Sequence, residues 1–202
     1  MVPILGMLRV VASRESGSLR ENPWQVVSKD FCLSTFTLST NIIMTNYQEL
    51  SPSSRVWIYQ SNRPFTAVEG EAIRMQIQEF VTQWTSHNNA LKTWGDLVHD
   101  RFVVLMVDES MAGASGCSID KSVAFVKQVE QATGVDMFDR FNFAYKDSEK
   151  VLSASREEFE QLFKEGKIGE ETVVFNNLVQ TKAEFEAKWA VKLGDSWHKN
   201  FV

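Results

Sequence analysis

Residues 101–107 read Arg-Phe-Val-Val-Leu-Met-Val, and Asp108 follows this nearly unbroken apolar run. Strands covered on both faces show continuous apolar runs, whereas strands with one face in water alternate apolar and polar residues. A loop over 109–117 comes next, and a helical pattern then runs from about Ser118 until Gly134 ends it. We therefore expect a central buried strand whose following loop leads into a deeply packed helix.

Further strands and helices alternate around this unit. Aromatic and β-branched runs predict strands at Arg55–Gln60, Phe141–Tyr145 and Thr172–Phe175. Capping boxes, in which Ser or Thr precedes Glu by three residues, predict helices after Thr66, Ser155 and Thr181. The first of these helices is expected to run for about 24 residues. Because strands alternate with helices, we expect an α/β fold, a single layered domain with a mixed, mainly parallel sheet flanked by helices.

The first 43 residues lack this patterning. They contain Pro23 and a Ser/Thr-rich stretch at 34–40, which are typical of irregular chain. We expect 1–43 to be an irregular extension upstream of a protein that natively starts at Met44, and 44–202 to be the single domain. The alternative is a genuine, partly ordered N-terminal arm.

Charge and cysteine content narrow the class of protein. The chain carries 21 Lys and Arg against 26 Asp and Glu, a net charge of −5, which disfavours nucleic-acid binding. No apolar run approaches the roughly 20 residues that a membrane span needs. Cys32 and Cys117 match neither a disulfide framework nor a zinc spacing, which favours a cytoplasmic location. The sequence specifies no cofactor and no oligomeric state.

Three runs carry a resemblance to a known family. They are Ser-Arg-Val-Trp-Ile-Tyr-Gln-Ser-Asn-Arg-Pro-Phe at 54–65, Gly-Ala-Ser-Gly-Cys-Ser-Ile-Asp-Lys-Ser at 113–122, and Asp-Ser-Trp-His-Lys at 195–199. Over about 45–202 the chain resembles small bacterial proteins often labelled "ABC transporter ATPase". ATPases of that class use G-x-x-x-x-G-K-[ST] to surround the phosphates. Residues 113–122 do not fit that spacing, so we do not expect ATPase activity.

The segment 108–122 is the leading candidate for a binding site. The carboxyl ends of strands in open α/β sheets form the usual ligand crevice, and a helix N-terminus attracts anions. We expect an anionic small molecule or a protein partner to bind there. The expected binding residues are Arg63, Asp108, Ser115, Gly116, Ser118, Asp120, Lys121 and Asn176. The alternative is an ordinary helix start, in which Ser118 caps the helix and Asp120 complements its dipole.

Two kinds of enzyme remain open. A cysteine beside a helix N-terminus has a lowered pKa, so Cys117 is a candidate nucleophile of a hydrolase or transferase, with His198 as its base. A metal-assisted phosphodiesterase would instead use carboxylates such as Asp108 and Asp120. We assign no metal ligand from the sequence.

Overall fold

A computed structural model of the 202-residue chain describes residues 46–86, 89, 90, 92–109 and 116–202. The described residues belong to one compact unit, Ser39–Val202. The expected N-terminal extension lies almost wholly outside it and wholly outside the described residues. Among the described helices, none is both long enough and apolar enough to cross a membrane.

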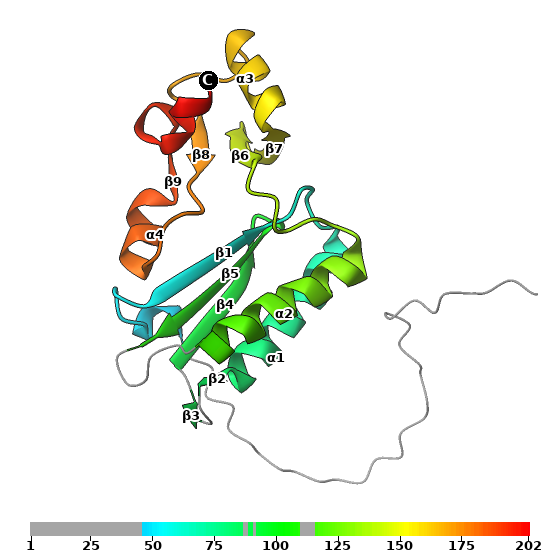
Figure 1. Cartoon of the computed structure of the whole chain (residues 1–202), viewed down its shortest axis with the longest axis vertical. Coiled ribbons are helices and arrows are strands. Elements are labelled where there is room, and N and C mark those ends of the chain that lie inside the picture. The colour runs from blue at the N-terminus through cyan, green and yellow to red at the C-terminus, as the bar shows by residue number, and fades with distance from the viewer. Residues whose placement is uncertain (1–45, 87–88, 91, 110–115) are drawn as a thin grey trace, which may run out of the picture. The chain divides into compact units, whose positions relative to one another are not determined.

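Strands and helices alternate irregularly along this unit (Figure 1). The α-helices are α1 (Ala67–Gln83), α2 (Gly116–Thr133), α3 (Arg156–Lys164) and α4 (Lys182–Lys188), and the short 3₁₀ helices are η1 (Tyr47–Glu49), η2 (Leu193–Asp195) and η3 (Trp197–Phe201). The strands are β1 (Arg55–Gln60), β2 (Thr85–Ser86), β3 (Asn89–Ala90), β4 (Lys92–Val98), β5 (Phe102–Asp108), β6 (Asn142–Asp147), β7 (Lys150–Ser155), β8 (Val173–Phe175) and β9 (Ala190–Lys192).

The described strands pair antiparallel throughout, so the expectation of a mainly parallel sheet is wrong. The first sheet has the order β1-β5-β4, and the second has the order β7-β6-β8-β9. The apolar run at 102–107 is indeed the central strand of the first sheet, and all of its residues are buried. Its neighbours run opposite to it, with Arg55 beside Val107 and Gln60 beside Phe102.

Two strands that the sequence did not predict, β4 and β7, explain the antiparallel pairing. The chain turns back on itself between β4 and β5 through His99 and Asp100, and between β6 and β7 through Ser148, all with positive φ. Non-glycine residues with positive φ occur mainly in tight turns, which join antiparallel neighbours. The expected first helix of about 24 residues also ends earlier, at Gln83, so that the chain is free to form β4.

Helices α1 and α2 cover one face of the first sheet (Figure 1). Ile73, Ile77 and Trp84, which recur at helical spacing along this segment, are almost fully buried there. Gly95 of β4 lies under α1, where an added Cβ would sit 2.8 Å from Ile77 Cγ2 and 3.0 Å from Val81 Cγ1. The helix can approach the sheet this closely because residue 95 has no side chain.

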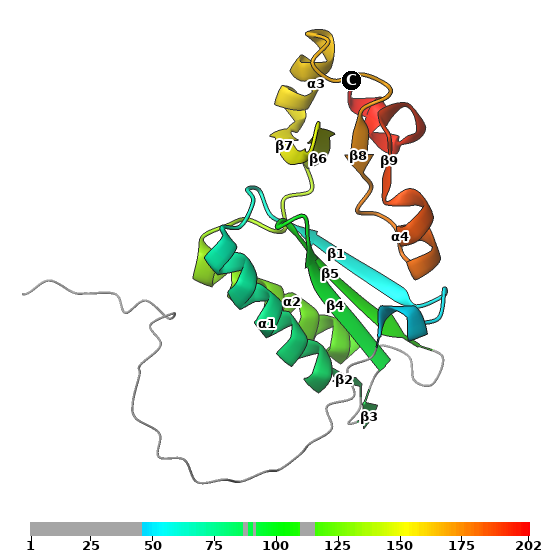
Figure 2. The ribbon, with the colours of Figure 1, turned by 180° about the vertical axis from the view of Figure 1, so that it is seen from behind.

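The other face of the first sheet packs against η1, α4 and the second sheet (Figure 2). Phe102 and Met106 of β5 share one apolar cluster with Ala144 of β6 and Phe175 of β8. The opposite face of the second sheet forms a third cluster with α3 and the C-terminal 3₁₀ helices. The first sheet is therefore enclosed between two helices and a second sheet.

Two of the three expected capping boxes and the expected glycine after α2 are confirmed. Thr66 and Ser155 each form a complete capping box with the Glu three residues later. Gly134 and Gly166 follow α2 and α3 with positive φ, the conformation that glycine adopts most readily. At α4, Thr181 accepts from Glu184 N, while the Glu184 carboxylate accepts from Gln180 N.

Candidate functional site

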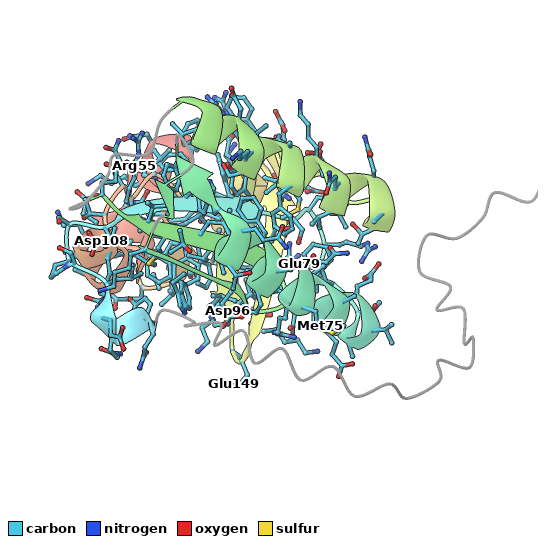
Figure 3. All side chains as sticks on the ribbon, turned by 90° about the horizontal axis from the view of Figure 1, so that it is seen from below. Arg55, Met75, Glu79, Asp96, Asp108 and Glu149 are labelled. Atoms are coloured by element: carbon cyan, nitrogen blue, oxygen red, sulfur yellow. The ribbon has the colours of Figure 1, made fainter. Side chains whose placement is uncertain are left out.

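The antiparallel pairing places the predicted site residues at different ends of the first sheet. Asp108 ends β5 beside Arg55, the first residue of β1, and Figure 3 shows these two side chains at the same end. Arg63 follows the last residue of β1 and therefore lies at the opposite end. The expectation that the residues after these strands frame one pocket depended on parallel strands, and the fold does not bring Arg63 and Asp108 together.

Much of the predicted site lies beyond what the structure describes. Residues 110–115, including Ser115, fall outside the described residues, and of Gly116, Cys117 and Ser118 only the backbone is described, as the first turn of α2. Asp120 and Lys121 are exposed on α2, and Asp108 is buried. Anion binding at this loop therefore stays a prediction, as does the Cys117 nucleophile.

Arg63 has a structural role. Its guanidinium donates two hydrogen bonds to the carboxylate of Glu69, at 3.0 and 2.9 Å, and a third to Thr133 O at the end of α2. The hydrogen bonds from Arg63, together with that from the backbone of Thr66, lower the pKa of Glu69 to about 2. Arg63 thus ties the start of α1 to the end of α2.

His198 and Asn176 do come close together, in the C-terminal part of the unit. The Trp197 side chain donates to Asn176 Oδ1 at 2.8 Å, and its ring stacks on His198. Cys117 lies in the first turn of α2, a helix about 27 Å long whose other end leads toward β6 (Figure 1). The fold does not place His198 beside Cys117.

A cavity of about 580 Å³ opens beside His198, and we call it the β1 cavity. It lies between the end of β1, residues 137–143, residues 175–178 and residues 197–198. Six large hydrophobic side chains are exposed among the described residues, and three of them line this cavity: Phe138, Phe141 and Leu178. Ligand-binding cavities have this size and an apolar lining with a few polar groups.

The polar groups of the β1 cavity form a connected network. Gln60 donates to the backbone oxygen of Asn142 at 2.7 Å and accepts from Asn177 at 2.8 Å. Asn177 in turn accepts from Trp189 Nε1 at 3.0 Å. These bonds join β1, β6 and the residues after β8, so the amide groups are held in fixed positions at the cavity wall.

His198 is the titratable group of this wall that burial affects most. Its side chain is 1 % exposed, and its Nδ1 shares a 2.7 Å hydrogen bond with Ser196 Oγ. Burial disfavours the imidazolium and lowers the pKa of His198 to about 4. At neutral pH the ring is uncharged, so it can donate or accept one hydrogen bond at Nε2 but is a weak general base.

Sequence reasoning missed most of these residues. Gln60, Phe138, Phe141 and Leu178 were not among the predicted site residues, although His198 was. A usable signal was present in Phe138-Asp-Arg-Phe141, where two large aromatic residues flank two charges in a segment between a helix and a strand. Such aromatics are either core or exposed for binding, and only the structure shows them exposed.

The described part of the chain contains no cluster of metal ligands, and the chain matches no known protein in the comparisons made. Within the described part, no group of three or more His, Cys, Asp or Glu side chains lies close enough to hold a metal ion. Comparisons of the chain with protein-family models, with curated proteins and with solved structures found no match. The resemblance to the small bacterial proteins labelled as ATPases therefore stays a prediction.

Proposed function

We propose that this chain is a binding protein whose ligand inserts an apolar group into the β1 cavity. The observation that carries the proposal is the coincidence of the cavity with exposed Phe138, Phe141 and Leu178. Exposed apolar side chains that gather around a cavity are costly to leave in water and are typical of binding sites.

The charge of the cavity wall supports an uncharged ligand group. One basic side chain, Arg140, and one acidic side chain, Asp139, line it, so their charges offset each other. His198 is neutral at physiological pH, and the amides of Gln60 and Asn177 are neutral as well. A group with an apolar body and one hydrogen-bonding atom matches this wall better than a phosphate does.

A neutral, apolar, fluorescent probe tests the proposal. We expect Nile red to bind the intact chain and Leu178→Ser to weaken that binding by about fivefold, because part of the buried apolar contact is lost. Met75→Ser is the matched control, since Met75 is 68 % exposed against 66 % for Leu178 but does not line the cavity; it lies on α1 (Figure 3). Equal effects of the two substitutions, or no binding at all, would contradict the proposal.

The site predicted at 108–122 is a separate proposal. It concerns the opposite end of the first sheet, and anion binding there would leave Nile red binding unchanged. An anion that displaced Nile red would instead indicate that its site is the β1 cavity.

A further inference from the structure

The outer edge of β1 is hydrogen-bonded at its two ends, and its backbone groups are unpaired between them, where Ile58 is half-buried and Gln60 is 7 % exposed. Val56 N donates to Gln180 O at 2.9 Å, and beyond the strand Asn62 N donates to Asp136 O at 2.9 Å. In an extended chain, alternate residues point their backbone groups to the same side. Ile58 and Gln60 therefore direct their N–H and C=O groups outward, as Val56 and Asn62 do.

The outward groups at Ile58 and Gln60 have no hydrogen-bond partner within the described residues. The inward side is occupied: Ser61 N donates to Arg101 O at 3.0 Å, and the odd-numbered residues of β1 pair with β5. Unpaired edges of this kind favour the addition of another strand, and proteins usually cover or blunt them.

Two cavities flank the open part of the edge. Ile58 and Gln60 line the β1 cavity, and a second cavity of about 310 Å³ runs along residues 55–59 and 177–180. Leu178 and Tyr59 line both cavities. The open backbone groups therefore lie where exposed apolar side chains gather.

We infer that the open edge of β1 binds a short extended peptide segment of a partner protein, which adds as a strand beside Ile58 and Gln60. This inference rests on the binding function proposed above and names its ligand class. The chain itself already uses the same edge in this way, because Thr181 forms an antiparallel bridge with Arg55. Peptide recognition by strand addition combines backbone hydrogen bonds with side-chain pockets.

The geometry specifies the peptide. About 20 Å of extended chain separates Val56 from Asn62, so the open gap accepts about four residues. In an antiparallel arrangement one peptide residue exchanges both backbone bonds with Ile58, and the residue two positions earlier does so with Gln60. Side chains of directly opposed residues share a face, so these two peptide residues face the same side as Ile58 and Gln60. We expect both to be apolar.

Selection from a phage-displayed library of random peptides about ten residues long provides the probe. We expect enrichment of peptides with apolar residues two positions apart. The selected peptide, made synthetically, is then measured by fluorescence anisotropy against Ile58→Pro and Ile58→Ala. Both variants lose the Ile side chain, but only proline removes the outward N–H, at a position whose N–H makes no bond to β5.

Ile58→Pro should bind the peptide about tenfold more weakly than Ile58→Ala does, as the loss of one backbone hydrogen bond predicts. Equal binding by the two variants would overturn strand addition. Amide hydrogen exchange on the unaltered chain gives an independent test if the proline variant does not fold. Peptide binding should slow exchange at Ile58 and Gln60 but leave Trp57 and Tyr59, which already pair with β5, unchanged.

The two proposals fail separately. Absence of enriched peptides, or unchanged exchange at Ile58 and Gln60, overturns strand addition while Nile red binding remains to support the cavity. Loss of Nile red binding with peptide binding intact would instead overturn the apolar cavity as the primary site.

Discussion

The two ends of the first sheet differ in the groups that could bind a ligand. Where β5 ends, the sequence places a glycine-containing loop and a helix N-terminus next to Asp108, a pattern associated with anion sites. Where β1 ends, the structure places a cavity with exposed aromatic side chains and a buried, neutral His198. The first end is recognisable from local sequence, whereas the second is assembled from four separate segments.

The difference shows how strand direction decides which residues form a site. In a parallel sheet the residues after β1 and after β5 would share one edge, and Arg63 would face Asp108. In the antiparallel sheet the two strands end on opposite sides. Arg63 therefore joins the cavity end, where it is bound to Glu69 rather than free for a ligand.

The largest expected effect concerns the cavity end and its histidine. Burial lowers the pKa of His198 to about 4 in the folded chain. The unfolded chain therefore binds a proton at this residue near pH 6.5, whereas the folded chain binds it only near pH 4. The free energy of unfolding should therefore fall by about 3 kcal/mol between pH 6.5 and pH 4 and change no further through this group at lower pH. Urea denaturation at a series of pH values measures this loss.

His198→Phe supplies the control for that titration. The variant should lose this component of the pH dependence, whatever its stability at pH 7. His99, whose pKa is also lowered by burial, is present in both proteins and cancels in the comparison. An NMR titration of the intact chain with a His198 midpoint near 6.5 would contradict the buried, neutral wall of the cavity.

A smaller effect tests β4, the strand that precedes β5 and pairs antiparallel with it. Gly95→Ala brings a methyl group within 3.0 Å of Ile77, Leu105 and Val81, so we expect a loss of about 2 kcal/mol in the free energy of unfolding. Gly169→Ala is the matched control, because no atom lies within 4 Å of the added Cβ there, and its effect should stay within about 0.5 kcal/mol. If both substitutions were neutral, β4 would not pack under α1, and the separation of the two ends would lose its basis.

The sequence predicts local features of this fold well. The apolar run of β5, the capping boxes at Thr66 and Ser155, and the glycines after α2 and α3 each depend on neighbouring residues. The signals for these features lie within one turn or one strand, and for this reason they could be read without knowledge of the rest of the chain.

Strand direction and the cavity could not be read in this way. In β4, buried and less buried residues alternate, but the sequence does not show this as an apolar pattern. Lys92 and Asp96 are charged, and the buried position 95 is a glycine, which has no apolar side chain to mark it. The cavity depends on contacts such as that of Gln60 with Asn142 and Asn177, which are distant in sequence. No local pattern encodes such contacts, so His198 and Asn176 could be proposed as site residues, whereas Gln60, Phe138 and Leu178 could not.

The smallest expected effect distinguishes a structural Arg63 from a ligand-binding one. Arg63→Gln removes the hydrogen bonds to Glu69 and weakens the link to Thr133 at the end of α2, so the free energy of unfolding should fall by about 1 kcal/mol. By NMR, the pKa of Glu69 should rise from about 2 toward its ordinary value, since the hydrogen bonds from Arg63 are the main cause of its lowering. Arg74→Gln is the control, because Arg74 is equally exposed but pairs with a single oxygen of the more exposed Asp100, and its cost should be smaller. Nile red binding should not change in either variant, and a loss confined to Arg63→Gln would show that this arginine serves the cavity as well as the fold.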